Sequence, residues 1–322
     1  MNLDITLSDL RMAQTILAPY IITTPVLEAP SLLTPTGHSI LLKAENLQRS
    51  GSFKMRGASY GIAQLTQEQR RRGIIAYSTG NHAQAVALAA QFQQISATIV
   101  MSPDAPAFKV ERTRKSGATI VWAEPTSQAR RDLAEKLAKE HQLTLIPPYD
   151  HRDILLGQGT IGLEIMEQCA PAAVFVPIGG GGLIAGIALA IKFVHPSIQI
   201  IGVEPEWEND AWQSFTQGKL VTLPAASKSI ADAIRVQAVG ELPYAVLRRY
   251  VDEVVTVSET QIATATLSVL AETHLVLEPA GAVALAAARS YQGSLPASKP
   301  VVAIASGGNT TLETLWSLTA MQ

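Results

Sequence analysis

Cysteine is almost absent from this chain, because Cys169 is the single cysteine among 322 residues. One thiol cannot form a disulfide within the chain. It lies at a helical spacing in the stretch from Ile161 to Cys169, which favours a buried, inert side chain in a reducing compartment. We therefore expect a cytoplasmic protein.

Charged residues and long apolar runs are also scarce. Only 16% of the residues are charged, the formal net charge is -2 and no basic block occurs, so a nucleic-acid partner is not expected. The apolar run from Leu183 to Ile191 is far shorter than the ~20 residues that cross a bilayer. The first ten residues carry Asp4 and Asp9 and lack a basic segment before an apolar one. We therefore expect neither a membrane partner nor a secretory signal.

Short β-branched runs alternate with stretches of helical spacing along most of the chain, which is typical of parallel βαβ units. A hydrophobic fraction of 47% favours a compact core, and the alanine-rich helices with only 5% aromatic residues suit close packing on a sheet. The expected strands are 40–44, 74–77, 97–101, 119–123, 173–177, 198–203, 253–257 and 301–305. The expected helices are one from Leu7 that ends before Pro19, then 55–65, 82–93, 106–116, 126–141, 154–169, 183–194, 260–273 and 280–290. The Pro147-Pro148 pair is the best candidate for a domain boundary.

One lysine lies in an unusual setting, the stretch Ser50-Gly51-Ser52-Phe53-Lys54-Met55-Arg56-Gly57-Ala58. A lysine is ordinarily a solvated surface charge. Here two glycines let the backbone pass close to another group, and Phe53 places an apolar ring beside the amine. A partly dry pocket disfavours the ammonium form, lowers the pKa and makes the amine a nucleophile and base. Lys54 therefore has the setting that a Schiff-base lysine needs.

Four consecutive glycines, Gly179, Gly180, Gly181 and Gly182, join an apolar strand directly to an apolar helix. Out of context such a run would be a flexible linker. A strand, glycine loop and helix N-terminus instead present bare backbone N–H groups, which bind phosphate. The run matches neither the Walker loop nor the dinucleotide fingerprint. We therefore interpret it as a phosphate cradle.

Two further turns follow expected strands, at Ser78-Thr79-Gly80-Asn81-His82 and at Ser306-Gly307-Gly308-Asn309. The first can be an ordinary strand-to-helix turn, with Asn81 capping the helix and Gly80 at positive φ. Ligands of open α/β sheets bind at the carboxyl ends of the strands, so its hydroxyl and N–H groups can also hold a small carboxylate.

A lysine amine, a phosphate cradle and a carboxylate-binding turn together describe pyridoxal phosphate holding an amino acid. The chain resembles the serine/threonine dehydratase and serine racemase group of the tryptophan-synthase-β-like pyridoxal-phosphate enzymes, fold type II. The motifs that carry the resemblance span nearly the whole chain: the lysine stretch Ser50 to Ala58, Ser78 to Gln84, Gly157-Gln158-Gly159-Thr160, Gly179 to Gly182, Glu278-Pro279-Ala280-Gly281 and Ser306 to Asn309.

The resemblance implies an α/β fold of two doubly wound open-sheet domains with the cofactor in the cleft between them. Residues 1–66 and 151–322 would form the large cofactor-binding domain, and residues 67–150 a small mobile substrate domain. A homodimer is implied as well. Because the sequence ends at Gln322, shortly after Asn309, we expect no regulatory domain of the biosynthetic threonine dehydratase kind.

The same resemblance assigns roles to residues at the cofactor. Lys54 would form the Schiff base and later act as general base at Cα. Ser306 would face the pyridine nitrogen, and a neutral serine makes the ring a shallower electron sink, which favours prompt loss of a β-leaving group. The remaining contacts would be Phe53 on one face of the ring, Asn81 at its 3-hydroxyl, and Gly179 to Gly182 at the phosphate.

At the substrate, the resemblance places Ser78, Thr79 and His82 around the carboxylate. Thr79 stands where racemases usually have a serine as the base on the opposite face, and its β-branch restricts the hydroxyl, so its acid/base role stays open. Two interpretations of Arg130 are open. It is either an exposed helix charge beside Arg131 or the partner of a second substrate carboxylate, as in 3-hydroxyaspartate.

The stretch Glu204-Pro205-Glu206-Trp207-Glu208-Asn209-Asp210 resembles the divalent-cation loop of the serine racemase branch. Glu204 and Asp210 would supply carboxylate oxygens and Glu208 a backbone carbonyl to Mg²⁺ or Ca²⁺. The alternative is a solvated acidic loop.

The function implied is an ammonia-lyase that converts a β-hydroxy amino acid, such as serine, threonine or 3-hydroxyaspartate, into a 2-oxo acid and ammonia. The alternative enzyme is an amino-acid racemase at the same site. A third possibility is a ligand-binding module that senses a phosphorylated metabolite.

Overall fold

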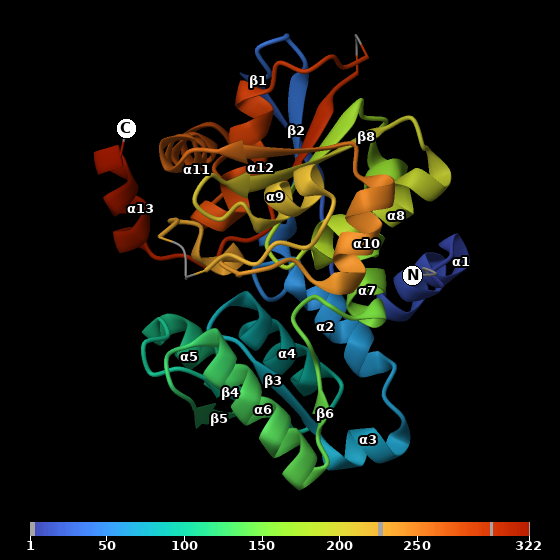
Figure 1. Ribbon diagram of the computed structural model, residues 1–322, viewed down its shortest axis with the longest axis vertical. Coiled ribbons are helices and arrows are strands. Elements are labelled where there is room, and N and C mark those ends of the chain that lie inside the picture. The colour runs from blue at the N-terminus through green and yellow to red at the C-terminus, as the bar shows by residue number, and fades with distance from the viewer. Residues whose placement is uncertain (1–3, 225–227, 297–298, 322) are drawn as a thin grey trace.

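The computed structural model describes residues 4–224, 228–296 and 299–321. Two sheets form the frame, one in each of the two bodies that Figure 1 shows above one another. The six-stranded sheet has the order β1 (Val26–Leu33), β2 (Ser39–Lys43), β10 (Val301–Ile304), β7 (Ala173–Pro177), β8 (Gln199–Pro205) and β9 (Glu253–Val257). The four-stranded sheet has the order β5 (Thr119–Trp122), β4 (Ala97–Met101), β3 (Ile74–Tyr77) and β6 (Thr144–Leu145).

The helices connect these strands. They are α1 (Leu7–Leu17), α2 (Lys54–Ala63), α3 (Gln67–Arg72), α4 (Asn81–Phe92), α5 (Ala107–Lys115), α6 (Ser127–His141), α7 (Arg152–Gln168), α8 (Gly182–Val194), α9 (Asp210–Gln217), α10 (Glu241–Tyr250), α11 (Glu259–Thr273), α12 (Pro279–Ser290) and α13 (Leu312–Leu318). Short 3₁₀ turns lie at Glu45–Leu47 (η1), Asp232–Ile234 (η2) and Thr319–Met321 (η3). Among the described residues no helix is long and apolar enough to span a membrane.

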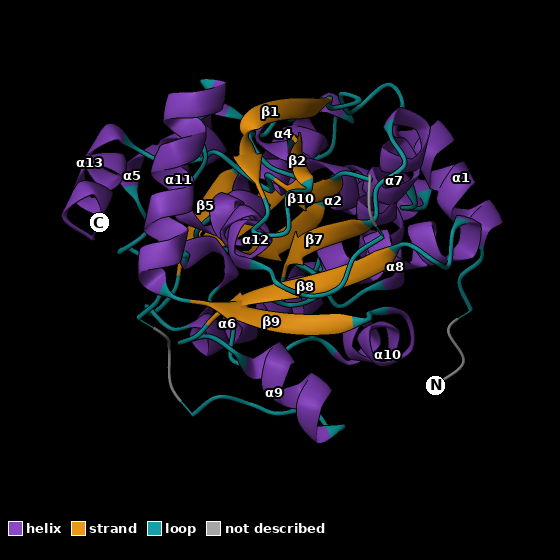
Figure 2. Ribbon diagram, turned by 90° about the horizontal axis from the view of Figure 1, so that it is seen from above, coloured by secondary structure: helices purple, strands orange, loops and turns teal. Residues whose placement is uncertain are grey.

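The large sheet is buried on both faces, because the side chains of its central strand alternate between two hydrophobic clusters. Val174 and Val176 of β7 pack with the helices α7 and α8, whereas Ala173 and Phe175 pack with α12. Figure 2 shows these two helix layers on opposite sides of the strands. All strand pairs are parallel except β1 with β2. This arrangement contains the parallel βαβ units that the alternating sequence predicts, and it is the doubly wound fold that the resemblance implies.

The small sheet follows the same plan. Ile74 and Ala76 of β3 face the cluster that includes α4, whereas Ile75 faces α6. All its strands are parallel. Helix α2 packs on both α4 and α7 and lies between the two bodies (Figure 1).

All eight expected strands and all nine expected helices are present, with ends that differ by at most two residues. The segment after Pro25 forms the edge strand β1, which is not among the expected strands, and the sequence also did not predict β6, α3, α9, α10 or α13. Cys169 is half-buried rather than buried, because it follows the last residue of α7. Burial still raises its thiol pKa, which keeps the thiol protonated.

Candidate active site

Lys54 is the first residue of α2, directly after Phe53. Its Nζ donates a hydrogen bond of 2.7 Å to the carbonyl oxygen of Pro148 and lies 5.1 Å from the centroid of the Phe53 ring. Burial lowers the pKa of the Lys54 amine to about 8. A substantial share of this amine is therefore neutral near physiological pH and can act as a nucleophile.

The four glycines lie between β7 and α8, and α8 begins at Gly182. Gly181 has φ +83°, and a Cβ at Gly180 would lie 2.1 Å from the ring of Tyr149. Side chains at these positions would therefore collide with neighbouring groups, and the backbone N–H groups stay bare. A bare loop at the N-terminus of a 13-residue helix suits a phosphate group.

The C-terminal turn lies against the lysine loop. Phe53 N donates to the Ser306 carbonyl at 3.0 Å, and Gly308 N donates to the Gly51 carbonyl at 2.9 Å. Ser306 is buried, and its hydroxyl donates to the Ala280 carbonyl at 3.4 Å. The lysine loop and the Ser306 turn, both of which the resemblance assigns to the cofactor, are thus joined by backbone hydrogen bonds.

Asn81 reaches this turn from the small sheet. Its Nδ2 donates to Glu278 Oε1 at 2.5 Å, and its Oδ1 accepts from Asn309 Nδ2 at 2.8 Å. The predicted helix cap is wrong, because Asn81 is the first helical residue and Gly80 is the cap, with φ -130° rather than a positive angle. Gly80 N instead donates to the hydroxyl of Ser78, which shapes the turn without left-handed backbone.

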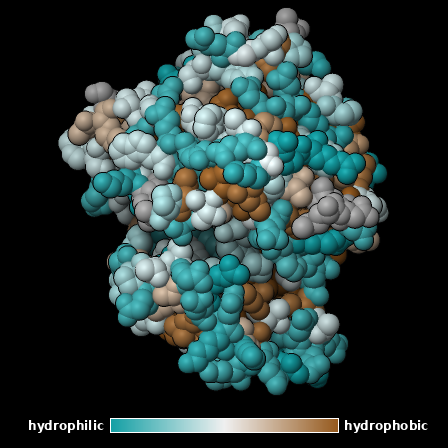
Figure 3. All heavy atoms as spheres, viewed as in Figure 1, coloured by the Kyte–Doolittle hydropathy of each residue, from teal (hydrophilic) through white to brown (hydrophobic). Residues whose placement is uncertain are grey.

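Glu278 belongs to the site, and no role was predicted for it. It is buried, its Oε2 has no hydrogen-bond partner among the described residues, and burial raises the pKa of its carboxyl to about 7. It lines a cleft of 590 Å³ across which Lys109 pairs with Asp232 at 3.0 Å. Figure 3, which has the view of Figure 1, shows a recess between the two bodies. The one local signal was its position before Pro279, at the start of an alanine-rich helix.

The turn after β3 carries the predicted carboxylate site. Ser78 and Thr79 are half-buried there. His82 is buried, and burial together with the nearby Lys54 amine lowers its pKa to about 3, so the imidazole is neutral. Its Nε2 donates to the Ile146 carbonyl at 2.9 Å, two residues before the carbonyl that accepts from Lys54. His82 and Lys54 therefore hold the same short segment, 146–148.

Arg130 does not contact the residues around Lys54. It lies on α6, half-buried, and donates to the hydroxyls of Ser102 at 3.2 Å and Ser127 at 3.0 Å. Burial lowers the pKa of its guanidinium. Its neighbour Arg131 is exposed and pairs with Glu135, so the two arginines of this helix differ in setting.

The predicted cation ligands lie together at the end of β8. Glu204 accepts hydrogen bonds from Ala211 N at 3.1 Å and Trp212 N at 2.7 Å. Burial and the Asp210 carboxylate raise the pKa of Glu204, and burial raises the pKa of Asp210 to about 7 and that of Glu208 to about 7. Both Asp210 oxygens lack a hydrogen-bond partner within the described ranges.

Within the part of the chain that the structure describes, no three His, Cys, Asp or Glu side chains converge in a metal-binding geometry. The predicted cation site uses only two carboxylates, from Glu204 and Asp210, together with a backbone carbonyl of Glu208. The ligand set therefore remains a prediction.

The lysine, the glycine cradle and the joined turns fit pyridoxal phosphate. The chain belongs to the family of pyridoxal-phosphate dependent enzymes, whose model matches residues 17–307. Within this family, an L-threo-3-hydroxyaspartate ammonia-lyase of Pseudomonas sp is 40% identical over 92% of this chain and 92% of that protein. A catabolic L-threonine dehydratase of Staphylococcus aureus is 42% identical, over 96% of this chain and 90% of that protein.

The solved structure of maize serine racemase has a TM-score of 0.92 at 39% identity, and covers 98% of this chain and 96% of that chain. The family match and these similarities confirm the predicted family, its α/β fold and its cofactor, and they make the chain an enzyme.

Proposed function

We propose that this chain is a pyridoxal-phosphate dependent ammonia-lyase that converts a β-hydroxy amino acid into a 2-oxo acid and ammonia. The observation that carries the proposal is the Lys54 amine, which is half-buried, has a pKa of about 8 and lies at the start of a helix beside Phe53. The names of the similar proteins support the substrate class, since two of them are ammonia-lyases or dehydratases of hydroxy amino acids.

Different side chains of the site have different roles in such a reaction. When bound, pyridoxal phosphate supplies an electron-withdrawing ring that takes up the charge released at Cα. Lys54, with its lowered pKa, removes the Cα proton as a general base. Ser78, Thr79 and the N–H groups of their turn hold the substrate carboxylate. Ser306 offers the ring a neutral hydroxyl, which favours loss of the β-hydroxyl over a long-lived carbanion.

The second candidate is racemisation at the same site, and the similarity to maize serine racemase favours it. Racemisation needs an acid/base group on each face of Cα. Thr79 is the candidate for the second face, and its β-branch limits where the hydroxyl can point. We propose racemisation as the minor activity.

Substrate binding by a mobile small domain is part of the proposal. Residues 67–150 would move against 1–66 and 151–322, which brings Arg130 toward the substrate. The half-buried setting of Arg130 beside Ser102 supports a role different from that of exposed Arg131. A second carboxylate, as in 3-hydroxyaspartate, would pair with this arginine.

We further propose that Glu204, Asp210 and the carbonyl of Glu208 bind Mg²⁺ or Ca²⁺. The raised pKa values of the three carboxyls and the unpartnered oxygens of Asp210 support a bound cation, which would compensate their buried charge.

A homodimer and a cytoplasmic location complete the proposal. Three exposed apolar side chains, those of Ile22, Leu47 and Phe92, support self-association. They belong to one region, because the Ile22 backbone N–H donates to Gln48 Oε1, Leu47 precedes Gln48, and the Arg49 guanidinium lies over the Phe92 ring. The cytoplasmic location rests on the single cysteine.

The experiment that tests the function is incubation with L-serine, L-threonine and L-threo-3-hydroxyaspartate in separate reactions. Each is assayed for 2-oxo acid, for ammonia and for the opposite enantiomer. Formation of 2-oxo acid from at least one of them supports the proposal, and its absence from all three contradicts it.

A further inference from the structure

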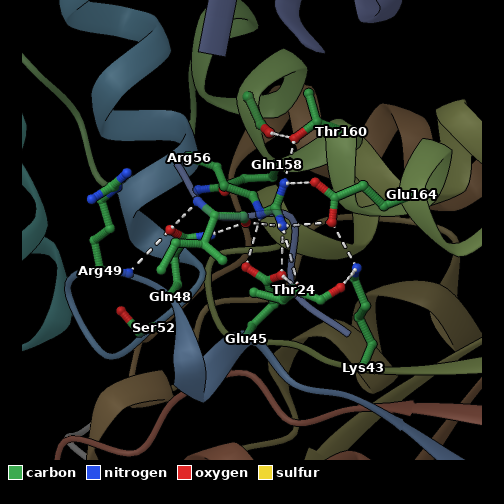
Figure 4. Close-up of polar contacts among 12 residues, drawn as sticks. Thr24, Lys43, Glu45, Gln48, Arg49, Ser52, Arg56, Gln158, Thr160 and Glu164 are labelled. Carbon is green, nitrogen blue, oxygen red and sulfur yellow. Dashed lines mark hydrogen bonds and ion pairs between the residues drawn. The ribbon is translucent and has the colours of Figure 1, made fainter. Parts of the chain in front are cut away.

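A cluster of four charged side chains lies completely inside the molecule, next to the helix that begins with the active-site lysine. Lys43, Glu45, Arg56 and Glu164 form it, and their side chains are 0 to 3% exposed. They come from β2, η1, α2 and α7 (Figure 4). Neither the cofactor chemistry nor the substrate contacts described above use this cluster.

Arg56 is the centre of the cluster, because both edges of its guanidinium are occupied. Nε and Nη2 donate to the two oxygens of Glu45 at 2.8 and 2.7 Å. Nη1 and Nη2 donate to the two oxygens of Glu164 at 2.6 and 2.8 Å. Two bidentate pairs in one plane fix the orientation of the arginine in a way that a single ammonium contact does not.

The remaining groups satisfy the carboxylates. Lys43 Nζ donates to Glu164 Oε2 at 2.6 Å and to the Thr24 carbonyl at 2.6 Å. The hydroxyl of Thr24 donates to Glu45 at 2.5 Å. Two cations thus balance two anions, and Arg56 holds the pKa of the Glu45 carboxyl below its usual value even though burial opposes this. A balanced, hydrogen-bonded set tolerates burial far better than a single charge does.

The cluster anchors the lysine loop at both of its ends. Glu45 stands where the loop begins, and Arg56 stands in the first turn of α2, two residues after Lys54. Their pairing therefore closes the loop from 45 to 56. No side-chain cap hydrogen bond stabilises the start of helix α2. The pairing of Arg56 with Glu45 therefore stabilises the first turn of the helix instead.

The cluster also anchors the partner of the lysine amine. The Pro148 carbonyl that accepts from Lys54 precedes α7 by four residues, and α7 carries Glu164. The two helices approach closely, since a Cβ at Gly157 would lie 2.6 Å from Cα of Gly57. The pair between Arg56 and Glu164 thus fixes α2 relative to the helix that follows Pro148.

We propose that Arg56 is a positioning residue for Lys54. By pairing with Glu45 and Glu164 it holds the first turn of α2 against α7, so that the lysine amine stays aligned with the Pro148–Tyr149 segment and the glycine loop. The proposal rests on Lys54 carrying the cofactor and not on which amino acid is the substrate.

The test compares Arg56→Lys with Lys43→Met. Arg56→Lys keeps the charge and loses the planar double pairing. Lys43→Met removes a buried charge from the same cluster without touching α2. Thermal unfolding is measured for both, and the kinetics are measured at a temperature at which both keep their full circular dichroism. The first readout is the rate at which the cofactor-free protein captures pyridoxal phosphate, followed by visible absorbance. The second readout is the steady-state kinetics, from which kcat and KM are determined separately.

Both variants should unfold at lower temperature, because each disturbs a buried pair. Arg56→Lys should also slow cofactor capture and lower kcat by roughly 10- to 100-fold, since a displacement of about 1 Å costs that much. KM should change little, because the carboxylate turn lies on the other sheet. Lys43→Met should keep capture and kcat near the values of the unaltered protein.

The proposal is overturned if both variants lose cofactor capture equally, or if Arg56→Lys is destabilised and yet captures the cofactor normally. Should Arg56→Lys not fold, Glu45→Gln replaces it, since this change weakens one of the two pairs and leaves the other intact. Slowed capture in Glu45→Gln supports the proposal, and normal capture contradicts it.

Discussion

The amine of Lys54 donates a hydrogen bond of 2.7 Å to the carbonyl oxygen of Pro148, which lies 94 residues further along the chain. This contact joins the start of α2 to the segment at which the chain leaves the small sheet and enters α7. Tyr149, the next residue, packs against the glycine loop. The segment therefore lies against both the Lys54 amine and the predicted phosphate cradle.

The first prediction concerns Lys54 itself. Lys54→Ala should abolish the absorbance band of the Schiff base between lysine and cofactor and all turnover, while the protein stays folded by far-ultraviolet circular dichroism. Lys115→Ala, an exposed lysine paired with Glu111, is the control and should keep both. Because the neutral amine is the nucleophile and its pKa is about 8, capture of the cofactor should accelerate as the pH rises to about 8 and then level off. A variant Lys54→Ala that keeps the band and turnover contradicts the assignment.

A second prediction concerns the face of Cα opposite Lys54. Thr79→Ser removes the methyl group that restricts the hydroxyl and should raise the share of L-serine that is racemised rather than eliminated. Chiral chromatography of serine and an assay of pyruvate in the same samples measure the ratio. An unchanged ratio would remove Thr79 from the acid/base chemistry.

Arg130 provides a third prediction. Arg130→Ala should lower kcat/KM for L-threo-3-hydroxyaspartate by roughly 10- to 100-fold, because a bidentate pair with the second carboxylate is worth about 1.5–3 kcal/mol. The effect on L-serine should be much smaller, since serine has no second carboxylate. Arg131→Ala is the matched control, and equal losses for both substrates would assign Arg130 a structural role instead.

The fourth prediction concerns the carboxylates at the end of β8. Their pKa values are raised, so the folded state without a cation binds more protons than the unfolded state above pH 4. The stability of the chelated protein should therefore fall as the pH rises from about 4 to about 7 and stay low above that. Mg²⁺ or Ca²⁺ should restore the melting temperature at pH 8 more than at pH 5.

The variant Asp210→Asn should lose the response to the cation, whereas Glu206→Gln, at an exposed position of the same loop, should keep it. Differential scanning fluorimetry with and without chelator measures both. A melting temperature that does not respond to either cation at any pH would contradict the proposed site.

The sequence predicted those features that a short stretch of chain determines. The glycine run between a strand and a helix is such a feature, because β7, the loop and α8 are consecutive and their function follows from local backbone geometry. The alternation of strands and helices is another. The order of these strands and helices is confirmed, with small shifts at the ends of the elements, and the phosphate-binding role of the glycines stays a prediction.

The sequence could not predict features that depend on distant packing. Arg56 and Glu164 are separated by 108 residues, and Asn81 and Glu278 by 197. No local pattern distinguishes these polar side chains from solvated ones, and only the packing of α2 on α7 buries the first pair. The edge strand β1 was missed for a related reason, since Pro25 before it and Pro30 within it are typical of a connection, and only pairing with β2 makes it a strand.

The central claim is that elimination is the main reaction, and one time course with L-serine tests it most directly. The purified protein, saturated with pyridoxal phosphate, is incubated with L-serine, and pyruvate, ammonia and D-serine are measured in the same samples. We predict that pyruvate and ammonia form in equal amounts and exceed D-serine at every time point. More D-serine than pyruvate would contradict the account.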